Sequence, residues 1–102
     1  VYPLQEFRQK LEEARRAPTT DRRTRDYLRV LLSGAEDVIP DKQGRITIPG
    51  HLRTYADLDR ECAVIGALDR LEIWSLPAWE AYLEQKEEGF AQTAEEVVPG
   101  LF

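Results

Sequence analysis

The hydrophobic periodicity of this chain changes at Gly34, and the change restricts the folds that the chain can adopt. Before Gly34, apolar residues recur every three or four positions, which is the spacing typical of amphipathic helices. After it, residues 45–48 alternate between polar side chains and isoleucine, which is the spacing of a half-buried strand. Two periods in separate segments predict an α+β fold.

The segment before Gly34 predicts two helices joined by a short loop. The first helix is expected over residues 4–16, because Pro3 suits the start of a helix. Residues 17–20, Ala-Pro-Thr-Thr, interrupt it and offer a threonine to cap a second helix over residues 20–33. Two antiparallel helices with a short connection form a helical hairpin. The second helix carries an arginine stripe, interpreted first as a solvated face: Arg22, Arg25 and Arg29.

The segment after Gly34 predicts the order β-β-α-β-β, followed by a helix. The expected strands cover residues 35–40, 46–48, 61–66 and 71–74, with a short helix over residues 51–56. Ser75 is expected to cap the last helix, with Pro77 in its first turn. Four short strands with exposed edges make a poor core alone, so we expect dimerisation or a missing half.

The acidic tail over residues 89–102 leaves two alternatives open. It either lacks fixed structure or docks Leu101 and Phe102 against the rest of the protein. The chain lacks methionine and begins Val-Tyr-Pro-Leu, so we expect it to be part of a longer protein.

The net charge of −5 is unevenly distributed along the chain. Residues 1–56 hold eleven Lys/Arg against eight Asp/Glu, a net +3, whereas residues 57–102 hold three against eleven, a net −8. A polyanion responds to the local patch more than to the total charge. The first half could therefore face phosphate, although chance clustering of surface charges stays an alternative.

Catalytic and metal chemistry find little support in the sequence. His51 and Cys62 are the single residues of their types, too few for a metal site and separated by a helix and a loop. Cys62 is expected to be a small core residue on a strand, and His51 to lie near solvent in the first turn of a helix. We therefore expect no enzymatic activity, no cofactor, no metal and no small-molecule substrate.

The compartment and the aromatic residues add two weaker expectations. The chain has no apolar run long enough to span a membrane and no visible secretory signal, which favours the cytoplasm. Four aromatic residues could stack on bases, but packing in a core or against a partner is the favoured interpretation: Tyr2, Trp74, Trp79 and Tyr82.

The best candidate for a functional element is the turn Asp-Lys-Gln-Gly-Arg over residues 41–45. Gly44 permits a positive φ, and Asp41 can accept backbone N–H bonds that make the turn rigid. Lys42, Gln43 and Arg45 would then be displayed on a protrusion. Lysine suits phosphate, arginine suits phosphate or guanine, and glutamine suits an adenine edge or phosphate. An ordinary solvated turn is the alternative interpretation.

Taken together, the sequence resembles the MraZ family of bacterial transcriptional regulators, within the AbrB/SpoVT-type swapped-hairpin β-barrel superfamily. The resemblance runs nearly end to end and depends on these stretches: residues 2–4, 31–34, 41–46, 48–49, 52–53, 55–56, 58, 64–66, 71–74 and 79. The family has two β-rich repeats per chain, separated by a helix pair. This sequence resembles the helix pair (residues 1–33), the second repeat with its terminal helix (residues 34–88) and an acidic tail (residues 89–102).

The resemblance implies an α+β swapped-hairpin half-barrel and a function in binding double-stranded DNA. In the family, chains assemble into rings on repeated promoter boxes of the division and cell-wall gene cluster. For this sequence a homo-oligomer associated with the nucleoid is expected, with a swapped dimer imitating the missing repeat. Arg45 is the implied DNA contact, with Lys42 and Gln43 in the same motif, and Asp41 and Gly44 are structural. Arg53 is implied as either a DNA contact or a member of an ion pair.

Two other functional classes stay open beside DNA binding. In one, this half of the protein serves oligomerisation or protein interaction, with its acidic helix and tail as the docking surface. In the other, the chain is an antitoxin of the same superfamily. The second is less favoured, because such chains couple one barrel repeat to a toxin-binding tail without a preceding helix pair.

Overall fold

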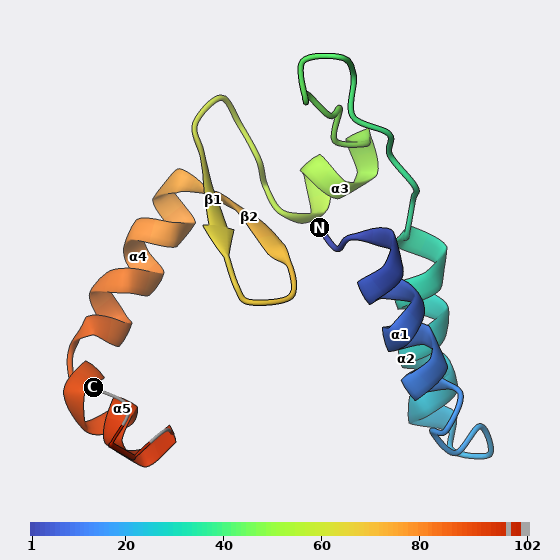
Figure 1. The fold of residues 1–102 in the computed structure, drawn as a ribbon, viewed down its shortest axis with the longest axis horizontal. Helices are drawn as coiled ribbons and strands as arrows, with labels where there is room; N and C mark the ends of the chain where they lie inside the picture. The colour runs from blue at the N-terminus through green and yellow to red at the C-terminus, as the bar shows by residue number, and fades with distance from the viewer. Residues whose placement is uncertain (98, 101–102) are drawn as a thin grey trace.

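The computed structural model of the chain describes residues 1–97 and 99–100. The elements follow the order α1 (Leu4–Ala14), α2 (Arg22–Gly34), α3 (Gly50–Tyr55), β1 (Cys62–Gly66), β2 (Leu71–Ser75), α4 (Leu76–Glu87) and α5 (Phe90–Val97). In Figure 1, α1 and α2 lie on one side, the two strands with α4 and α5 on the other, and α3 between them. The mixture of helices and strands is consistent with the predicted α+β class.

The helices α1 and α2 run in opposite directions and are joined by residues 15–21 (Figure 1). Pro3 precedes α1 as expected. The cap of α2 is Asp21 rather than a threonine: its carboxylate accepts the backbone N–H of Arg23 at 2.8 Å. The guanidinium of Arg25 donates to the carbonyl of Thr19 at 2.8 Å, which fastens the connecting loop to α2.

The strands β1 and β2 form an antiparallel pair in which Val64 lies opposite Ile73. The helix α4 covers one face of this pair, because Trp74 of β2 packs against Trp79 and Tyr82 of α4 with ring centroids 5.4 and 5.0 Å away. Aromatic packing was the favoured interpretation for these residues, and the contacts confirm it. Ser75 caps α4 as expected, since its hydroxyl accepts the backbone N–H of Ala78 at 3.2 Å.

The predicted strands over residues 35–40 and 46–48 are wrong for this structure. Among the residues described, the sheet has two strands, β1 and β2, and both segments lack regular structure. The backbone N–H of Asp41 donates to the carbonyl of Arg45 at 2.9 Å, but no further backbone bond joins the two arms in the described part of the chain. A lone two-stranded hairpin is marginal in water, and these arms have nothing to pack against: Ile39 is 90% exposed.

The chain therefore has an open shape. Its radius of gyration is 16.8 Å, whereas a compact domain of this length has a value of about 13 Å. Within the described residues, no hydrophobic side chain is buried. Cys62 was expected in a core and is exposed instead, because it lies on the face of the hairpin that α4 leaves uncovered. The described residues do not confirm the swapped-hairpin half-barrel, which stays a prediction.

The start of the chain contacts the β hairpin. The backbone nitrogen of Val1 donates to the carbonyl of Leu71 at 2.6 Å, and the backbone N–H of Leu71 donates to the carbonyl of Val1 at 2.8 Å. The ammonium of Lys10 on α1 lies 3.4 Å from the carboxylate of Asp69, in the turn between β1 and β2. These contacts hold α1 beside the hairpin.

The acidic tail contains a helix, α5, over Phe90–Val97. The alternative without fixed structure is therefore wrong for this part of the tail, and the predicted docking of Leu101 and Phe102 lies outside the described residues. Among the helices in the described part of the chain, none has both the length and the apolar composition needed to span a bilayer.

Candidate nucleic-acid interface

The turn over residues 41–45 is built around the side chain of Asp41. One carboxylate oxygen, Oδ1, accepts the backbone N–H of Gln43 at 2.9 Å and that of Arg45 at 2.8 Å. The backbone N–H of Gly44 donates to the carbonyl of Asp41 at 3.0 Å. A side chain that bonds its own backbone two and four residues later makes a short loop rigid. The expectation that Asp41 closes the turn is confirmed.

Gly44 supplies the conformation that the turn requires. Its φ is +78°, in the left-handed region that an L side chain enters at a cost. A Cβ at this position would meet no heavy atom within 4 Å, so space is not the restriction. The backbone angle alone explains why glycine is suited to this position.

The side chain of Arg45 is exposed, and a hydrogen bond to Asp41 fixes its orientation. Its Nε donates to the second carboxylate oxygen of Asp41, Oδ2, at 3.0 Å, while its side chain is 74% exposed. No other partner of the Arg45 side chain occurs among the described residues, so the two terminal nitrogens of the guanidinium face solvent. The backbone N–H of Arg45, then that of Gln43 and the guanidinium of Arg45, hold the pKa of Asp41 below its ordinary value. The acceptor is therefore ionised at neutral pH.

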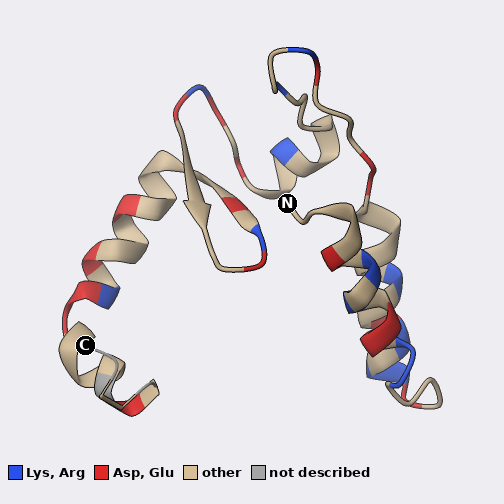
Figure 2. Ribbon diagram, in the orientation of Figure 1, with Lys and Arg blue, Asp and Glu red and all other residues tan. Residues whose placement is uncertain are grey.

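Lys42 and Gln43 lie at the tip of the same turn, and both are exposed. Figure 2 shows the loop between α2 and α3 projecting from the molecule, with basic positions at its tip and on the adjacent α3. The predicted site residues of the turn are thus presented together, on a protrusion that a flat or grooved surface could contact.

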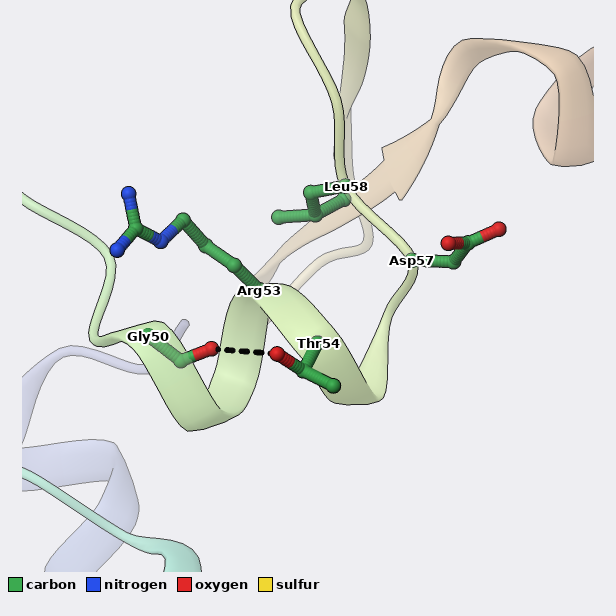
Figure 3. A pocket seen from close by; sticks show the side chains of 5 residues that line it. All are labelled: Gly50, Arg53, Thr54, Asp57 and Leu58. Carbon is green, nitrogen blue, oxygen red and sulfur yellow. Dashed lines mark hydrogen bonds between the residues drawn. The ribbon is translucent and has the colours of Figure 1, made fainter.

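Arg53 lies on α3, which follows the turn in the sequence, and no hydrogen bond or ion pair joins its side chain to the turn among the described residues. It lines a surface pocket with Gly50, Thr54, Asp57 and Leu58. In Figure 3 the side chains of Arg53 and Asp57 extend to opposite sides of the pocket. No ion pair of Arg53 occurs in the part of the chain that the structure describes, so the ion-pair interpretation is not supported there.

One contact that joins the end of α2 to α3 could not be predicted from the residue pattern. The imidazole of His51, in the first turn of α3 and exposed as predicted, places Nδ1 3.4 Å from the carboxylate of Glu36. Its Nε2 lies 3.2 Å from the carbonyl of Gly34, the last residue of α2. Residue spacing could not reveal this bridge, because the path of residues 35–49 decides it.

The arginine stripe of α2 is largely engaged within its own helix. Arg22 and Arg29 both lie near the carboxylate of Asp26, at 3.9 and 3.5 Å, and Arg25 bonds the preceding loop. These pairs are exposed, as expected for a solvated face. The stripe is a weaker candidate for phosphate binding than the turn.

Within residues 1–97 and 99–100 there is no group of three or more His, Cys, Asp or Glu side chains placed to hold a metal ion. Cys62 and His51 belong to separate contacts: the thiol of Cys62 lies 3.4 Å from the carbonyl of Asp59, and His51 makes the bridge described above. Their arrangement provides no nucleophile–base pair.

Comparison with known proteins gives a consistent answer. Residues 31–99 match the family described as "MraZ protein, putative antitoxin-like". The chain is 58% identical over 102 residues to a protein of Kocuria rhizophila named transcriptional regulator MraZ, covering 100% of this chain and 71% of that protein. Relatives of the same name from Kineococcus radiotolerans and Leifsonia xyli are 54% and 55% identical, each with 71% of its length covered and with 99% and 100% of this chain covered. No solved structure matches.

Proposed function

Because this chain belongs to the MraZ family, we propose that it acts as a sequence-specific, DNA-binding transcriptional regulator whose turn over residues 41–45 reads DNA. Its relatives carry the name transcriptional regulator, which supports regulation of transcription as the activity. The proposed role requires no catalysis and no cofactor. It places the protein in the cytoplasm, on the nucleoid.

The observation that carries this proposal is the exposed, pre-oriented guanidinium of Arg45. Its Nε is held by Asp41 at 3.0 Å, so the fork of terminal nitrogens is aimed outward before any ligand arrives. Such a fork fits a phosphate or the O6 and N7 atoms of guanine with two parallel bonds. Pre-orientation reduces the entropy that binding would otherwise cost.

The neighbouring side chains extend the proposed contact. Lys42 would neutralise a phosphate, Gln43 would contact an adenine edge or a phosphate, and Arg53 on α3 would bind the backbone beside the turn. Asp41 and Gly44 would keep the turn in shape without touching DNA.

One copy of the turn presents few basic groups, so tight binding would need several copies. We propose that the protein binds as a homo-oligomer to repeated promoter boxes of the division and cell-wall gene cluster, because linked contacts raise affinity through effective concentration. A ring is the assembly expected from the family, and a hairpin-swapped dimer is the form expected for this stretch alone. The uncovered arms around the turn, including Ile39 and Ile46, supply apolar surface that such an assembly would cover.

The test is a fluorescence-anisotropy titration against tandem-repeat promoter DNA at two salt concentrations. We expect binding that weakens steeply with salt, since neutralised phosphates release counterions, and that Arg45→Ala abolishes. Arg60→Ala is the matched control, because it removes the same charge from the loop between α3 and β1. Normal binding by Arg45→Ala, with the fold intact, would refute the assignment of Arg45.

An assembly module is the second candidate function, and one observation favours it. No hydrophobic side chain is buried in the described part of the chain, so partner binding is a need of the fold itself. In that case Arg45→Ala would leave oligomer formation unchanged, and the parent chain would show no salt-sensitive DNA binding. Measuring sedimentation and anisotropy on the same two samples separates the candidates.

A further inference from the structure

The turn over residues 41–45 lies in the middle of a long loop whose two ends meet. The loop covers residues 35–49, between the end of α2 at Gly34 and the start of α3 at Gly50. Connections of this length without helix or strand are uncommon in proteins and are usually functional. A surface loop of up to about 16 residues whose ends lie close together is an Ω-loop. Residues 35–49 have the length of such a loop, and a side chain of α3 joins its ends.

The ends of the loop are joined through both nitrogens of one imidazole ring. Nδ1 of His51, in α3, lies 3.4 Å from the carboxylate of Glu36 at the start of the loop. Nε2 of the same ring lies 3.2 Å from the carbonyl oxygen of Gly34 at the end of α2. We call this arrangement of His51, Glu36 and the carbonyl of Gly34 the His51 bridge. It connects the helix after the loop to both the helix before the loop and the loop's first residues.

The two arms of the loop, residues 37–40 and 46–48, make no hydrogen bond or ion pair with any other described residue. The hydrogen bonds in the middle of the loop all lie within the turn over residues 41–45 and depend on Asp41. The turn is therefore closed by its own bonds, whereas the direction in which it projects depends on how the arms are held at their base. In the described part of the chain, the His51 bridge is the polar contact at that base.

The arms are short, and a proline stiffens each of them. Pro40 directly precedes the turn, and Pro49, with φ −55°, directly precedes α3. A proline has a nearly fixed φ and keeps the residue before it in an extended conformation, so the backbones of Ile39 and Ile48 are restricted as well. Holding the base of two such arms therefore restricts the orientation of the turn that they carry.

Both atoms that face the imidazole ring of His51 are hydrogen-bond acceptors. A neutral imidazole carries one N–H and can donate to only one of these oxygens, whereas the protonated ring carries two and can donate to both. The protonated ring also gains the attraction of the Glu36 carboxylate. Arg53 lies two residues along α3 and, by helical spacing, does not share the face of His51. Among the described residues, Glu36 is the charged group in contact with the ring.

We propose that His51 is a positioning residue for DNA binding: by joining the ends of the loop, it fixes how the turn over residues 41–45 is presented to DNA. The His51 bridge is stronger when the ring is protonated. Since imidazole changes its charge between about pH 5 and 8, the affinity for DNA rises as the pH falls through this range. The bonds of Asp41 within the turn do not change, so the turn moves as a unit on its arms. The inference rests on the proposed function, because the turn must contact DNA for its presentation to matter.

The first measurement follows the free protein by nuclear magnetic resonance. His51 is the single histidine of the chain, so its ring signals need no further assignment, and long-range proton–nitrogen correlation spectra follow its protonation. Backbone amide relaxation reports the order of the arms, residues 37–39 and 46–48. We expect the arms to become more ordered as the ring is protonated, with the same midpoint pH for both curves. In His51→Gln, which keeps a donor but has no charge to gain, the arms should show no such change.

The second measurement is the affinity for tandem-repeat promoter DNA, by anisotropy titration at the two ends of the same pH range. We expect the parent chain to bind about fivefold more tightly when the ring is protonated, which is the factor that one additional hydrogen bond supplies. His51→Gln should bind with the lower affinity at both pH values. Glu36→Gln should reduce the dependence on pH, because it removes the charged acceptor of the His51 bridge.

A positive charge near DNA raises the affinity wherever it lies, so the matched control moves the imidazole. His51→Ala combined with Tyr55→His places the ring one turn further along the same face of α3, at a position where the side chain is 88% exposed. This variant keeps the charge that titrates and removes the His51 bridge. We expect its arms not to respond to pH and its affinity to stay below that of the parent chain when the ring is protonated. An equal pH dependence in both proteins would overturn the proposal, because charge alone would then explain it.

Two further results separate this proposal from the proposed function. Arm order that changes neither with pH nor in His51→Gln overturns the proposal, and DNA binding that still depends on Arg45 would leave the proposed function standing. If the parent chain binds no DNA at either pH, the proposed function fails, and with it the role of His51 in DNA binding. The arm order would then decide whether His51 holds the loop.

Discussion

The carboxylate of Asp41 holds Arg45 twice: Oδ1 accepts its backbone N–H at 2.8 Å, and Oδ2 accepts its side-chain Nε at 3.0 Å. One residue therefore both closes the turn and orients the exposed guanidinium at its base. Shape and charge at this turn depend on each other, and the first predictions follow from that dependence.

Replacing Asp41 should weaken DNA binding although the residue is acidic. Asp41→Ala removes the acceptor of three hydrogen bonds, so the turn loosens and Arg45 loses its orientation. Removing an acid normally strengthens attraction to phosphate, so a loss of about tenfold, the equivalent of about one good hydrogen bond, would identify a positioning role. Anisotropy titration measures it.

Asp41→Asn is the control for that experiment. It keeps an acceptor oxygen for the backbone and removes the charge, so we expect an intermediate affinity and nearly unchanged amide exchange at residues 43 and 45. If the affinity for DNA rises in both variants, the positioning role is contradicted, and Asp41 affects DNA binding through its negative charge alone.

The turn should also loosen in acid. The hydrogen bonds from Arg45 and Gln43 depress the pKa of Asp41 in the folded protein below its ordinary value. A depressed pKa means that the stabilisation is complete above the unfolded value and is lost as pH falls through the folded value. The amide resonances of residues 43 and 45 should therefore be constant from pH 7 to 5 and shift together below about pH 3.9, the ordinary pKa of an aspartate. Resonance shifts centred above that pH would contradict the lowered pKa of Asp41.

Gly44→Ala should affect the turn through backbone conformation alone. Its φ of +78° costs an L residue about 1–2 kcal/mol, and no atom within 4 Å would be displaced. We expect faster amide exchange in the turn and weaker DNA binding. Gly34→Ala is the matched control, because it also meets no atom within 4 Å but has no positive φ. Equal effects of the two substitutions would exclude a conformational cause.

Lys42→Ala should change the salt dependence of binding rather than its sequence preference. A lysine that neutralises one phosphate per copy contributes about 0.9 to the slope of log affinity against log salt. We expect the slope to fall by about that amount for each copy bound, with affinity reduced alike on cognate and scrambled DNA. A loss confined to cognate DNA would instead assign Lys42 to a base.

Trp79→Ala should destabilise the β1–β2 hairpin and leave the turn over residues 41–45 unchanged. The ring of Trp79 lies 5.4 Å from Trp74 and 5.8 Å from Tyr82, and each such pair contributes about 0.5–1.5 kcal/mol. We expect a loss of about 1–3 kcal/mol in denaturant unfolding, followed by near-UV circular dichroism, and a smaller loss for Trp79→Phe. Unchanged stability would mean that α4 does not support the hairpin.

Local rules predicted the features of this chain that depend on few neighbours. Gly44 was expected at positive φ and Ser75 as a helix cap, and both are determined by contacts within three or four residues. The turn formed by Asp41 belongs to the same class. A threonine was expected to cap α2, but the carboxylate of Asp21 accepts the backbone N–H of Arg23 and is the cap instead.

The sequence by itself determined α1 to α4, the strands β1 and β2 and the closed turn, though not α5, because hydrophobic period, caps and glycine angles act over short distances. Tertiary structure decided whether the apolar strand pattern became strands. Residues 35–40 and 46–48 have the alternation but no partner in this chain, so their backbone groups stay outside any ladder. Tertiary structure also decided that Val1 lies on Leu71 and His51 beside Gly34, since contacts between distant residues depend on the path of the loops, which periodicity does not encode.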